Sequence, residues 1–302
     1  MTYISNKVTT IGTFDGVHIG HQKILKQVVQ LANANGYTPV VLTLFPHPRM
    51  VLQKDDSIKL LNTIEERIRL LKSFGIKEVI VKKFTKDFAN LSAIDYVKQI
   101  LVDELNTKEI VIGYDHHFGK NRSANITDLK AFAKRYNFNV QEISAQDIED
   151  VTVSSTKIRT ALNQGQVALA NSYLGYNFFI TGTVVKGKEL GRTIDFPTAN
   201  INISATYKLI PNDGVYVVTS KIEGKTVFGM MNIGTNPTVD GKNKSIEVHF
   251  FNFKTDIYNV ELKIEFLKRL RSEEKFPNLE ALKIQLKKDM TNALDYIKSI
   301  ND

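Results

Sequence analysis

The chain contains no cysteine, which excludes disulfide bonds, thiolate metal sites and a cysteine nucleophile. No run of about twenty apolar residues is present, so we expect no membrane span. The residues from Met1 to Lys7 also lack the basic-then-apolar pattern of a secretory signal. With 302 residues the chain is long enough for two domains with separate cores. These features together predict a cytoplasmic protein.

Acidic residues are fewer than basic ones, and the formal net charge is +8. The residues up to Tyr176 carry +5 and the remainder +3, and there is no basic tail. A positive charge spread in this way favours small anionic ligands, whereas nucleic-acid binding proteins usually concentrate their basic residues. We therefore expect phosphorylated small molecules and no nucleic acid as partners.

The motif Gly-x-Gly-x-x-Gly is also missing, so the dinucleotide-binding form of an α/β fold is not supported. The chain carries instead Gly12-Thr13-Phe14-Asp15-Gly16-Val17-His18-Ile19-Gly20-His21, between a β-like run and an apolar-periodic segment. This order predicts a strand, a glycine-rich turn and a helix whose first N–H groups bind an anion. His18 and His21 share one face of the first helical turn and can donate hydrogen bonds to phosphate. A metal pair is the alternative, but no third ligand accompanies it.

Strands and helices alternate through the first half of the chain. Buried strands are predicted at 39–45, 78–81 and 109–113, and helices at 63–74 and 92–105. The alternation predicts a Rossmann-like α/β domain, with a doubly wound parallel sheet and flanking helices.

Two loops follow strand ends, where an open α/β sheet binds its ligand. The first, Phe45-Pro46-His47-Pro48, is stiffened by proline and is either a pocket wall or a plain connector. The second begins at Asp115, which can orient ribose or magnesium. Arg122 and Asn125 in and after this loop can meet phosphate or base.

A second anion-binding pattern, Ser154-Ser155-Thr156-Lys157-Ile158-Arg159, lies about 140 residues after the first. A serine caps the predicted helix, and Arg159 lies one turn in, on the face that looks back at the cap. Hydroxyls, backbone N–H groups and a guanidinium together suit β- and γ-phosphates. Any capped helix with an exposed arginine has a similar pattern, so the residues alone leave that alternative open.

The periodicity changes near Tyr176, which divides the chain into predicted domains 1–176 and 177–302. Short β-patterned runs at 178–186, 214–222, 226–233, 245–253 and 260–267 predict an antiparallel barrel or sandwich. An amphipathic helix at 278–300 is predicted to close one end. Along the fourth run, Ile246 and Val248 face one way and Glu247 the other.

Gly-x-Phe-Asp-Gly-x-His-x-Gly-His contains the HxGH signature of nucleotidylyltransferases, and Ser-Ser-Thr-x-Ile-Arg resembles their second signature. The longer pattern resembles the adenylyltransferase half of prokaryotic bifunctional riboflavin kinase/FAD synthetases. The resemblance implies catalytic roles in adenylyl transfer from ATP for His18, His21 and Arg159. It also implies a flavin pocket at Phe45, Pro46 and Pro48. The residues implied to bind ATP are Gly12, Thr13, Phe14, Asp15, Gly20, Asp115, Asn125, Ser154, Ser155 and Thr156.

Pro197-Thr198-Ala199-Asn200 reads by composition as an ordinary turn, but it resembles the specific motif of riboflavin kinases. The resemblance implies that Thr198 and Asn200 hold the Mg²⁺ of Mg-ATP, an ion that prefers oxygen ligands. Glu247 is implied as the base that deprotonates riboflavin, and Arg271 as a flavin contact. The residues implied to bind ATP in this half are Gly182, Gly187, Gly191 and Pro197, the glycines forming a flap.

One position departs from this pattern, because Asp195 stands where riboflavin kinases have glycine. If the position has positive φ, aspartate is among the less costly replacements. Its charge would nevertheless lie near ATP, which puts the kinase activity in question.

The resemblance covers essentially the whole chain and implies a bifunctional enzyme with ATP as co-substrate and Mg²⁺ at both steps. It would convert riboflavin to FMN, and FMN to FAD with release of pyrophosphate. FMN and FAD are then substrate and product rather than prosthetic groups, and the oligomeric state is open. Two alternatives remain. One is an FMN adenylyltransferase whose barrel binds flavin without phosphorylating it, and the other is a non-enzymatic flavin sensor that binds RNA.

Overall fold

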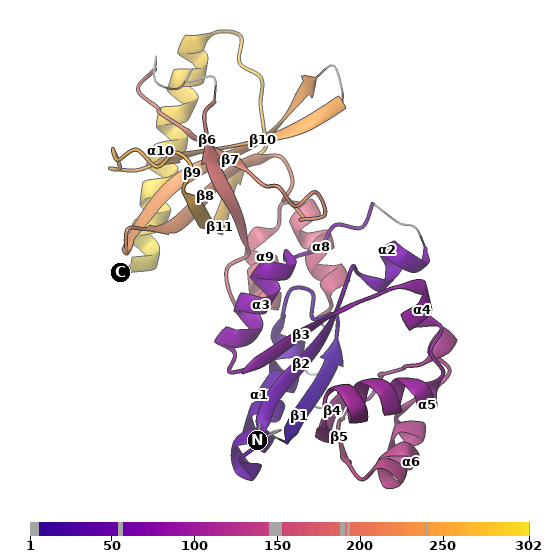
Figure 1. Ribbon diagram of the computed structural model, residues 1–302. Helices are drawn as coiled ribbons and strands as arrows, with labels where there is room; N and C mark the ends of the chain where they lie inside the picture. Colours follow the sequence, from indigo (N-terminus) through magenta and orange to yellow (C-terminus); the bar gives the residue numbers. More distant parts are fainter. Residues whose placement is uncertain are drawn as a thin grey trace. The chain divides into compact units, whose positions relative to one another are not determined.

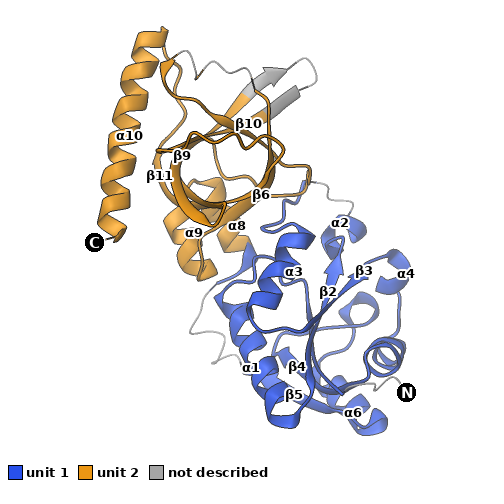
Figure 2. Ribbon diagram, turned by 60° about the vertical axis from the view of Figure 1, so that its left-hand side comes forward, with its two compact units in different colours: residues 1–155 blue, residues 156–302 orange. Residues whose placement is uncertain are grey.

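The computed structural model describes residues 6–53, 57–144, 153–187, 191, 194–238 and 241–301. The chain forms two compact units, Met1–Ser155 and Thr156–Asp302 (Figures 1 and 2). Each unit has its own sheet and its own buried core.

The first unit is built on a five-stranded parallel sheet. Its strands are β1 (Lys7–Gly12), β2 (Thr38–Phe45), β3 (Glu78–Lys83), β4 (Thr107–Gly113) and β5 (Asn139–Ile143). Their order is β3-β2-β1-β4-β5, and all neighbouring pairs are parallel. The first strand therefore lies in the middle and the chain winds outward to both sides, which confirms the predicted doubly wound fold.

Helices cover both faces of this sheet (Figure 1). They are α1 (Ile19–Asn35), α2 (Pro48–Leu52), α3 (Ile64–Ser73), α4 (Lys86–Ala89), α5 (Ala93–Asp95), η1 (Tyr96–Glu104), η2 (Lys120–Arg122) and α6 (Ile126–Tyr136). Val8, Val41 and Val111 pack in one core with side chains of α1 and α3. Leu42 and Ile110 face the other way, into a core with η1 and α6. Alternation of the strand residues between two cores follows from the two-residue side-chain period of a strand.

Two helices were predicted from their N-cap residues, and the structure confirms one as an α-helix and shows the other mostly as a π-helix. At residues 63–74, Glu66 N donates to Thr63 Oγ1 and Thr63 N donates to the Glu66 carboxylate, which is the expected capping box at the start of α3. At residues 92–105, the short α5 is followed by the π-helix η1. Its hydrogen bonds span five residues, as between Leu105 N and Ile100 O. The wider turn places both of these side chains and that of Tyr96 in one core.

In the second unit, six strands close into an antiparallel barrel (Figure 2). The strands are β6 (Phe179–Val185), β7 (Ala199–Asn202), β8 (Gly214–Ile222), β9 (Lys225–Thr238), β10 (Gly241–Phe250) and β11 (Glu261–Arg271). Their order around the barrel is β10-β7-β6-β11-β8-β9. The barrel confirms one of the two predicted architectures. Strand β7 was not predicted, because its four residues carry motif side chains rather than an apolar pattern.

Helix α10 (Leu279–Asn301) lies beside the barrel and packs on β9 and β11. Leu286 and Met290, four residues apart on the helix, pack on a small core made by Phe196, Val215 and Met230. The predicted helix at 278–300 is therefore confirmed.

Helices α8 (Ser155–Asn163) and α9 (Val167–Leu174) group with the barrel rather than with the parallel sheet. Asn171 Nδ2 donates to Phe266 O at 2.9 Å, and Phe178 N donates to Asn171 Oδ1 at 2.7 Å. Packing thus divides the chain after Ser155, whereas the sequence pattern changes near Tyr176. The two positions differ because periodicity registers the change from helix to strand, while packing follows contacts. The functional division at residue 176 stays a prediction.

Within the described ranges, we find no helix that combines the length and the apolar character needed to cross a membrane.

Candidate active sites

The first candidate site lies at the point where the parallel sheet changes winding direction. The chain passes from β1 to its neighbour β2 on one side and later to β4 on the other. Open α/β sheets bind ligands outside the carboxyl ends of the strands at this point. The histidine turn, residues 12–21, leaves β1 here, and the loop that contains Asp115 leaves β4. Topology therefore brings these two predicted segments to the same edge of the sheet.

His18 and His21 stack on each other at the start of α1. His18 is the N-cap residue, and its Nδ1 accepts a hydrogen bond from His21 N at 3.4 Å. The ring centroids are 3.7 Å apart and the planes are inclined by 17°. Because Nδ1 of His18 is an acceptor, the neutral ring carries its proton on Nε2. That nitrogen can donate to a ligand.

The environment keeps both imidazoles neutral at pH 7. Burial lowers the pKa of His18 to about 4, although the Asp15 carboxylate acts in the opposite direction. Burial, His18 and the Arg67 guanidinium lower the pKa of His21 well below its usual range. Among the described residues, Nδ1 of His21 is buried without a hydrogen-bond partner. A buried polar atom of this kind is costly, which makes it a natural contact for a polar ligand.

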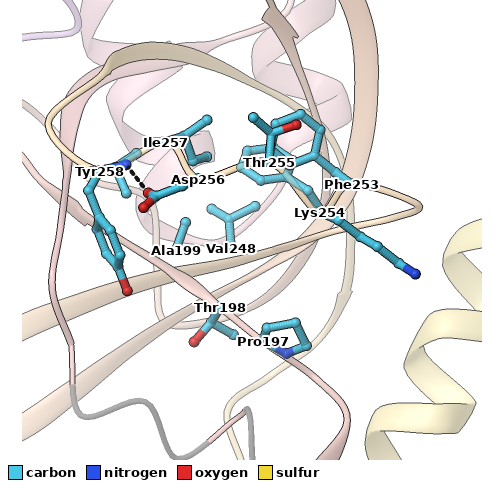
Figure 3. A pocket seen from close by; sticks show the side chains of 12 residues that line it. Pro197, Thr198, Ala199, Val248, Phe253, Lys254, Thr255, Asp256, Ile257 and Tyr258 are labelled. Carbon is cyan, nitrogen blue, oxygen red and sulfur yellow. Dashed lines mark hydrogen bonds between the residues drawn. The ribbon is translucent and has the colours of Figure 1, made fainter.

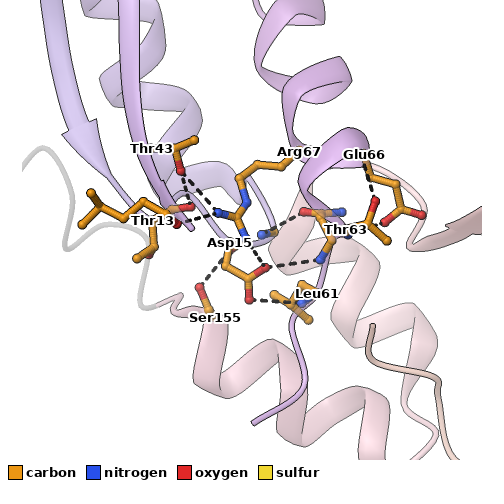
Figure 4. A network of polar contacts seen from close by, with 11 residues as sticks. Thr13, Asp15, Thr43, Leu61, Thr63, Glu66, Arg67 and Ser155 are labelled. Atoms are coloured by element: carbon orange, nitrogen blue, oxygen red, sulfur yellow. Dashed lines mark hydrogen bonds and ion pairs between the residues drawn. The ribbon is translucent and has the colours of Figure 1, made fainter. Parts of the chain in front are cut away.

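Asp15, a residue of the histidine turn, binds the turn to the segment that precedes α3 (Figure 4). Its carboxylate accepts hydrogen bonds from Leu61 N and Asn62 N at 3.1 and 3.2 Å. Gly16 N donates to Asn62 Oδ1 at 2.9 Å, which binds the turn to the same segment. The resemblance implied an ATP-binding role for Asp15. The structure shows its carboxylate occupied by the protein's own backbone.

Arg67 of α3 completes this buried network (Figure 4). Its Nη2 lies 3.6 Å from Asp15 Oδ1, and each of these two side chains is 1% exposed. Its Nη1 donates to Thr43 Oγ1 at 3.3 Å, and the Thr43 hydroxyl donates to Thr13 O at 3.0 Å. One guanidinium thus connects β2 and α3 to two residues of the histidine turn.

Two glycines of the turn leave room for rings. A Cβ on Gly20 would lie 3.3 Å from the His18 ring, and a Cβ on Gly12 would lie 3.1 Å from the Phe14 ring. Phe14 is buried with a φ of 46°, and its ring centroid lies 5.0 Å from that of His21. The turn is therefore shaped by the packing of its aromatic side chains.

The proline turn follows β2, beside the histidine turn. The Phe45–Pro46 peptide bond is cis, and Pro48 is the first residue of α2. His47 caps this short helix, because its Nδ1 accepts a hydrogen bond from Arg49 N at 3.2 Å. Since β2 pairs with β1, the structure places Phe45, Pro46 and Pro48 at the same sheet edge as the two histidines.

The loop after β4 carries an exposed Asp115. Asn125 is the N-cap of α6, and its Oδ1 accepts hydrogen bonds from Thr127 N and Asp128 N at 2.8 and 3.4 Å. The side-chain oxygen of Asn125 therefore serves the helix rather than a ligand. His116 packs on the Phe118 ring, and burial lowers its pKa to about 4.

Ser155 connects the second signature to the first. Its Oγ donates to Asp15 O at 2.8 Å (Figure 4). Ser154 comes just before α8, and Thr156 and Arg159 lie on α8 in the second unit.

The second candidate site lies on the barrel, where β7 pairs with β10. Thr198 Oγ1 donates to Glu247 Oε2 at 3.0 Å. Asn200 is the residue opposite Glu247 in the register of the two strands. The structure thus brings together the proposed metal residues and the proposed base, as the motifs implied. His249, two residues along β10, has its Nδ1 2.8 Å from Pro197 O.

The glycines of the expected flap contact the motif closely. A Cβ on Gly187 would overlap Asn200 Nδ2, and one on Gly191 would overlap Phe196 O. A Cβ on Gly182 would lie 2.6 Å from Ile201 Cγ2. Glycine is required most strictly at Gly191, where the neighbouring atom is a backbone oxygen, whereas a side chain at Gly187 would displace the Asn200 side chain. Residues 188–190 and 192–193 of the expected flap lie outside the described residues.

A cavity of about 340 Å³ adjoins Thr198 (Figure 3). Pro197 and Thr198 line one side of it, and the turn at residues 253–258 lines another. Tyr258 N donates to Asp256 Oδ1 at 2.9 Å, which fixes this turn locally. The barrel therefore offers a partly open cavity beside Thr198.

Arg271 is bound to α10. Its Nε lies 3.1 and 3.0 Å from the two Asp289 carboxylate oxygens, and its Nη2 lies 2.8 Å from Asp289 Oδ2. Nη1 donates to Ser272 O at 2.9 Å. The guanidinium thus holds the helix against the end of β11. A flavin that contacted Arg271 would have to share its N–H groups with Asp289 and Ser272.

A profile of the FAD synthetase family matches residues 2–157, and a profile of the riboflavin kinase family matches residues 174–297. The chain belongs to the bifunctional riboflavin kinase/FMN adenylyltransferase family. A family member of that name from Listeria monocytogenes is 38% identical over 299 residues, covering 98% of this chain and 94% of that protein. One from Escherichia coli K12 is 36% identical over 291 residues, covering 96% and 92%.

A solved structure described as a macrolide-efflux protein from Streptococcus pneumoniae has the same fold. It superposes with a TM-score of 0.86 at 33% identity, covering 95% of this chain and 93% of that one.

The departure at Asp195 from the riboflavin kinase motif has a simple backbone explanation. Its φ is 65°, in the left-handed region that aspartate tolerates better than most residues. The side chain is 87% exposed, and its Oδ2 lies 3.5 Å from Lys283 Nζ. The carboxylate is therefore directed to solvent beside a lysine.

Two features of the sites were not predicted from the sequence. Arg67 was not singled out, because an arginine in an amphipathic helix usually faces solvent. Its spacing of four residues from the buried Leu71 was the available signal. The turn at 253–258 was missed as a cavity wall. Asn252 and Asn259, both at positive φ, bracket it and are the residue type that marks such turns.

Proposed function

We propose that the first unit transfers the adenylyl group of ATP to FMN and that the barrel phosphorylates riboflavin with ATP. Each of the two family profiles covers a unit that has its own polar site. The observation that carries the proposal is this pairing of sites: stacked imidazoles at the switch point of the sheet, and Thr198 bonded to Glu247 on the barrel.

In adenylyl transfer, a phosphate oxygen of FMN attacks the α-phosphorus of ATP, and the bond to the leaving pyrophosphate breaks. His18 donates to a phosphate oxygen through Nε2–H, and His21 donates from its neighbouring ring. Both rings are neutral at pH 7, so each can act as a fixed hydrogen-bond donor. Loss of one such donor typically costs on the order of 10²–10³ in rate.

The other residues to which the adenylyltransferase resemblance gives a role are proposed to orient the substrates. Arg159 and the hydroxyls of Ser154 and Thr156 contact ATP phosphates. The flavin ring lies against the proline turn, residues 45–48. Asp115, in the loop after β4, meets the ribose of ATP.

In the kinase reaction, the terminal hydroxyl of riboflavin attacks the γ-phosphorus, and ADP leaves. Glu247 takes the proton of that hydroxyl as the new phosphorus–oxygen bond forms. The hydrogen bond from Thr198 orients the Glu247 carboxylate for this step. The exposed position of Asp195 is consistent with an active kinase site.

A magnesium ion fits the oxygen donors of Thr198 and Asn200. Because the Thr198 proton is directed to Glu247, its oxygen lone pairs can accept a cation. When bound, the ion neutralises negative charge on the ATP phosphates. The adjoining cavity, whose lining includes Phe253 and Tyr258, is proposed to receive the adenosine of ATP. A cytoplasmic location remains part of the proposal.

The test is a product time course with riboflavin, ATP and Mg²⁺, followed by chromatography. FMN should appear first and FAD later. His21→Ala should stop FAD formation and leave FMN formation unchanged, whereas Glu247→Gln should stop FMN formation from riboflavin but not FAD formation from added FMN. If either substitution silenced both reactions in a folded protein, the assignment of one reaction to each unit would be wrong.

A further inference from the structure

Arg67 ranks first by size among the fully buried side chains of the described residues. Arginine is almost never fully buried unless it is paired, because removing its charge from water is costly. With 1% of its side-chain surface exposed, Arg67 is too deeply buried to present its guanidinium at the protein surface. Its position therefore calls for an explanation other than direct binding.

We propose that Arg67 is a positioning residue for adenylyl transfer, which holds the histidine turn in its reactive geometry through Asp15 and Thr43. This proposal rests on the proposed function of the first unit and adds to it a residue that acts through others.

The planar guanidinium of Arg67 contacts two segments, the histidine turn and β2. Toward the turn, Nη2 lies 3.6 Å from Asp15 Oδ1, one residue before Gly16. Toward β2, Nη1 donates to Thr43 Oγ1 at 3.3 Å and approaches Leu44 O at 3.5 Å. Thr43 in turn donates to Thr13 O at 3.0 Å. A guanidinium presents several donors in a rigid plane and can serve both directions, whereas a lysine ammonium on a flexible stem cannot.

The same charge also acts on the histidine pair. Among the residues that the structure describes, the charged or titratable groups that act on these rings are Asp15, Arg67 and the two imidazoles themselves. The guanidinium lowers the pKa of His21, so its loss would raise that pKa. Protonating His18 on Nδ1 would remove the acceptor for His21 N, and protonating both rings would place like charges in a stack with centroids 3.7 Å apart. Burial is the largest cause of the low pKa of both rings, and for His21 the Arg67 charge acts in the same direction. Arg67 thus contributes to the neutral, stacked form of the pair.

The experiment compares three single variants of the full chain. Arg67→Met removes the charge and both connections, and Arg67→Lys keeps the charge but loses the planar geometry. Arg69→Met removes the same charge from an exposed position of the same helix and serves as the matched control. For each protein, kcat and KM of FMN adenylylation are measured against pH, and riboflavin phosphorylation by the same sample serves as an internal standard.

For Arg67→Met we expect a fall in adenylylation kcat on the order of 10²-fold, the loss typical of a displaced reacting group. We also expect the acid limb of its pH profile to move to higher pH. For Arg67→Lys we expect the fall in kcat without the shift of the acid limb. Arg69→Met should behave like the unchanged protein, and all variants should phosphorylate riboflavin normally.

A readout independent of turnover is the titration of the six histidines, followed by NMR after selective ¹⁵N labelling. A higher pKa of His21 in Arg67→Met supports the proposal. An unchanged histidine titration, with adenylylation lost only in proportion to unfolded protein, would mean that Arg67 is merely structural and would overturn it.

If Arg67→Met does not fold, the paired variant Asp15→Asn/Arg67→Met, which buries no unpaired charge, takes its place. Full adenylylation kcat in Arg67→Lys and in the paired variant would also overturn the proposal. Absence of FAD formation by the unchanged protein would instead refute the proposed function itself.

Discussion

Acid should destabilise the first unit, and His18→Asn should remove part of this effect. His18 is buried and titrates at about pH 4 in the folded protein, against 6.5 for the free group. Asparagine is one of the best N-cap residues, so the substitution keeps an acceptor for His21 N while removing a titrating ring. The comparison therefore separates protonation from helix capping.

The sign and size follow from proton linkage. Well above pH 6.5, His18 is neutral in both folded and unfolded chains and contributes no pH dependence. Below it, the unfolded chain binds a proton that the folded chain takes up only near pH 4, so the free energy of unfolding falls as the pH falls. By pH 5 the loss from this group is about 2 kcal/mol. His18 is also one cause of the low His21 pKa, so its removal reduces the second loss in the same direction.

Hydrogen–deuterium exchange of the peptides that span β1 and α1 measures the stability of this unit in the full chain. The chain has no tryptophan to report on it by fluorescence. Exchange rates, corrected for their intrinsic pH dependence, are compared at pH 7.5 and pH 5 for the unchanged protein and the variant. If both proteins lose the same stability between the two pH values, the buried, neutral state assigned to His18 is wrong.

Two further predictions concern the barrel, and the second has a matched control variant. Asp195→Gly should change the free energy of unfolding by less than about 1 kcal/mol and leave riboflavin phosphorylation unchanged, because glycine also adopts a φ of 65°; a large loss of kinase activity would show that the carboxylate takes part in the site. Arg271→Ala should lower the free energy of unfolding by about 3–5 kcal/mol in urea denaturation, since it leaves the Asp289 carboxylate, 2% exposed, without its cation. Lys263→Ala removes a half-exposed ammonium that pairs with Glu265 and lies over the Phe179 ring, and it should cost about 1 kcal/mol. Equal losses in the two variants would contradict the proposed role of Arg271 in holding α10 against the barrel.

The fold was predictable from the sequence where a local pattern dominates. The apolar runs of β2 and β4, the capping box of α3 and the glycine-rich start of α1 all appear in the structure near their predicted positions. Predictions from the sequence were weaker where tertiary packing determines the type of helix or the division into units. The π-helix η1 has the composition of an ordinary helix, and α6 and β5 were not predicted individually. The domain division also moved, because α8 and α9 pack with the barrel.

In the candidate sites too, residues close in sequence were predictable and residues that make long-range contacts were not. The two histidines lie three residues apart, and Thr198 and Asn200 two apart, so a motif can hold them. The residues that fix these groups come from distant positions: Arg67 reaches Thr43, and Ser155 reaches Asp15 across about 140 residues of chain. No local pattern encodes such contacts. A motif therefore identifies the groups that meet the substrate, whereas the structure is needed to identify the groups that hold them in place.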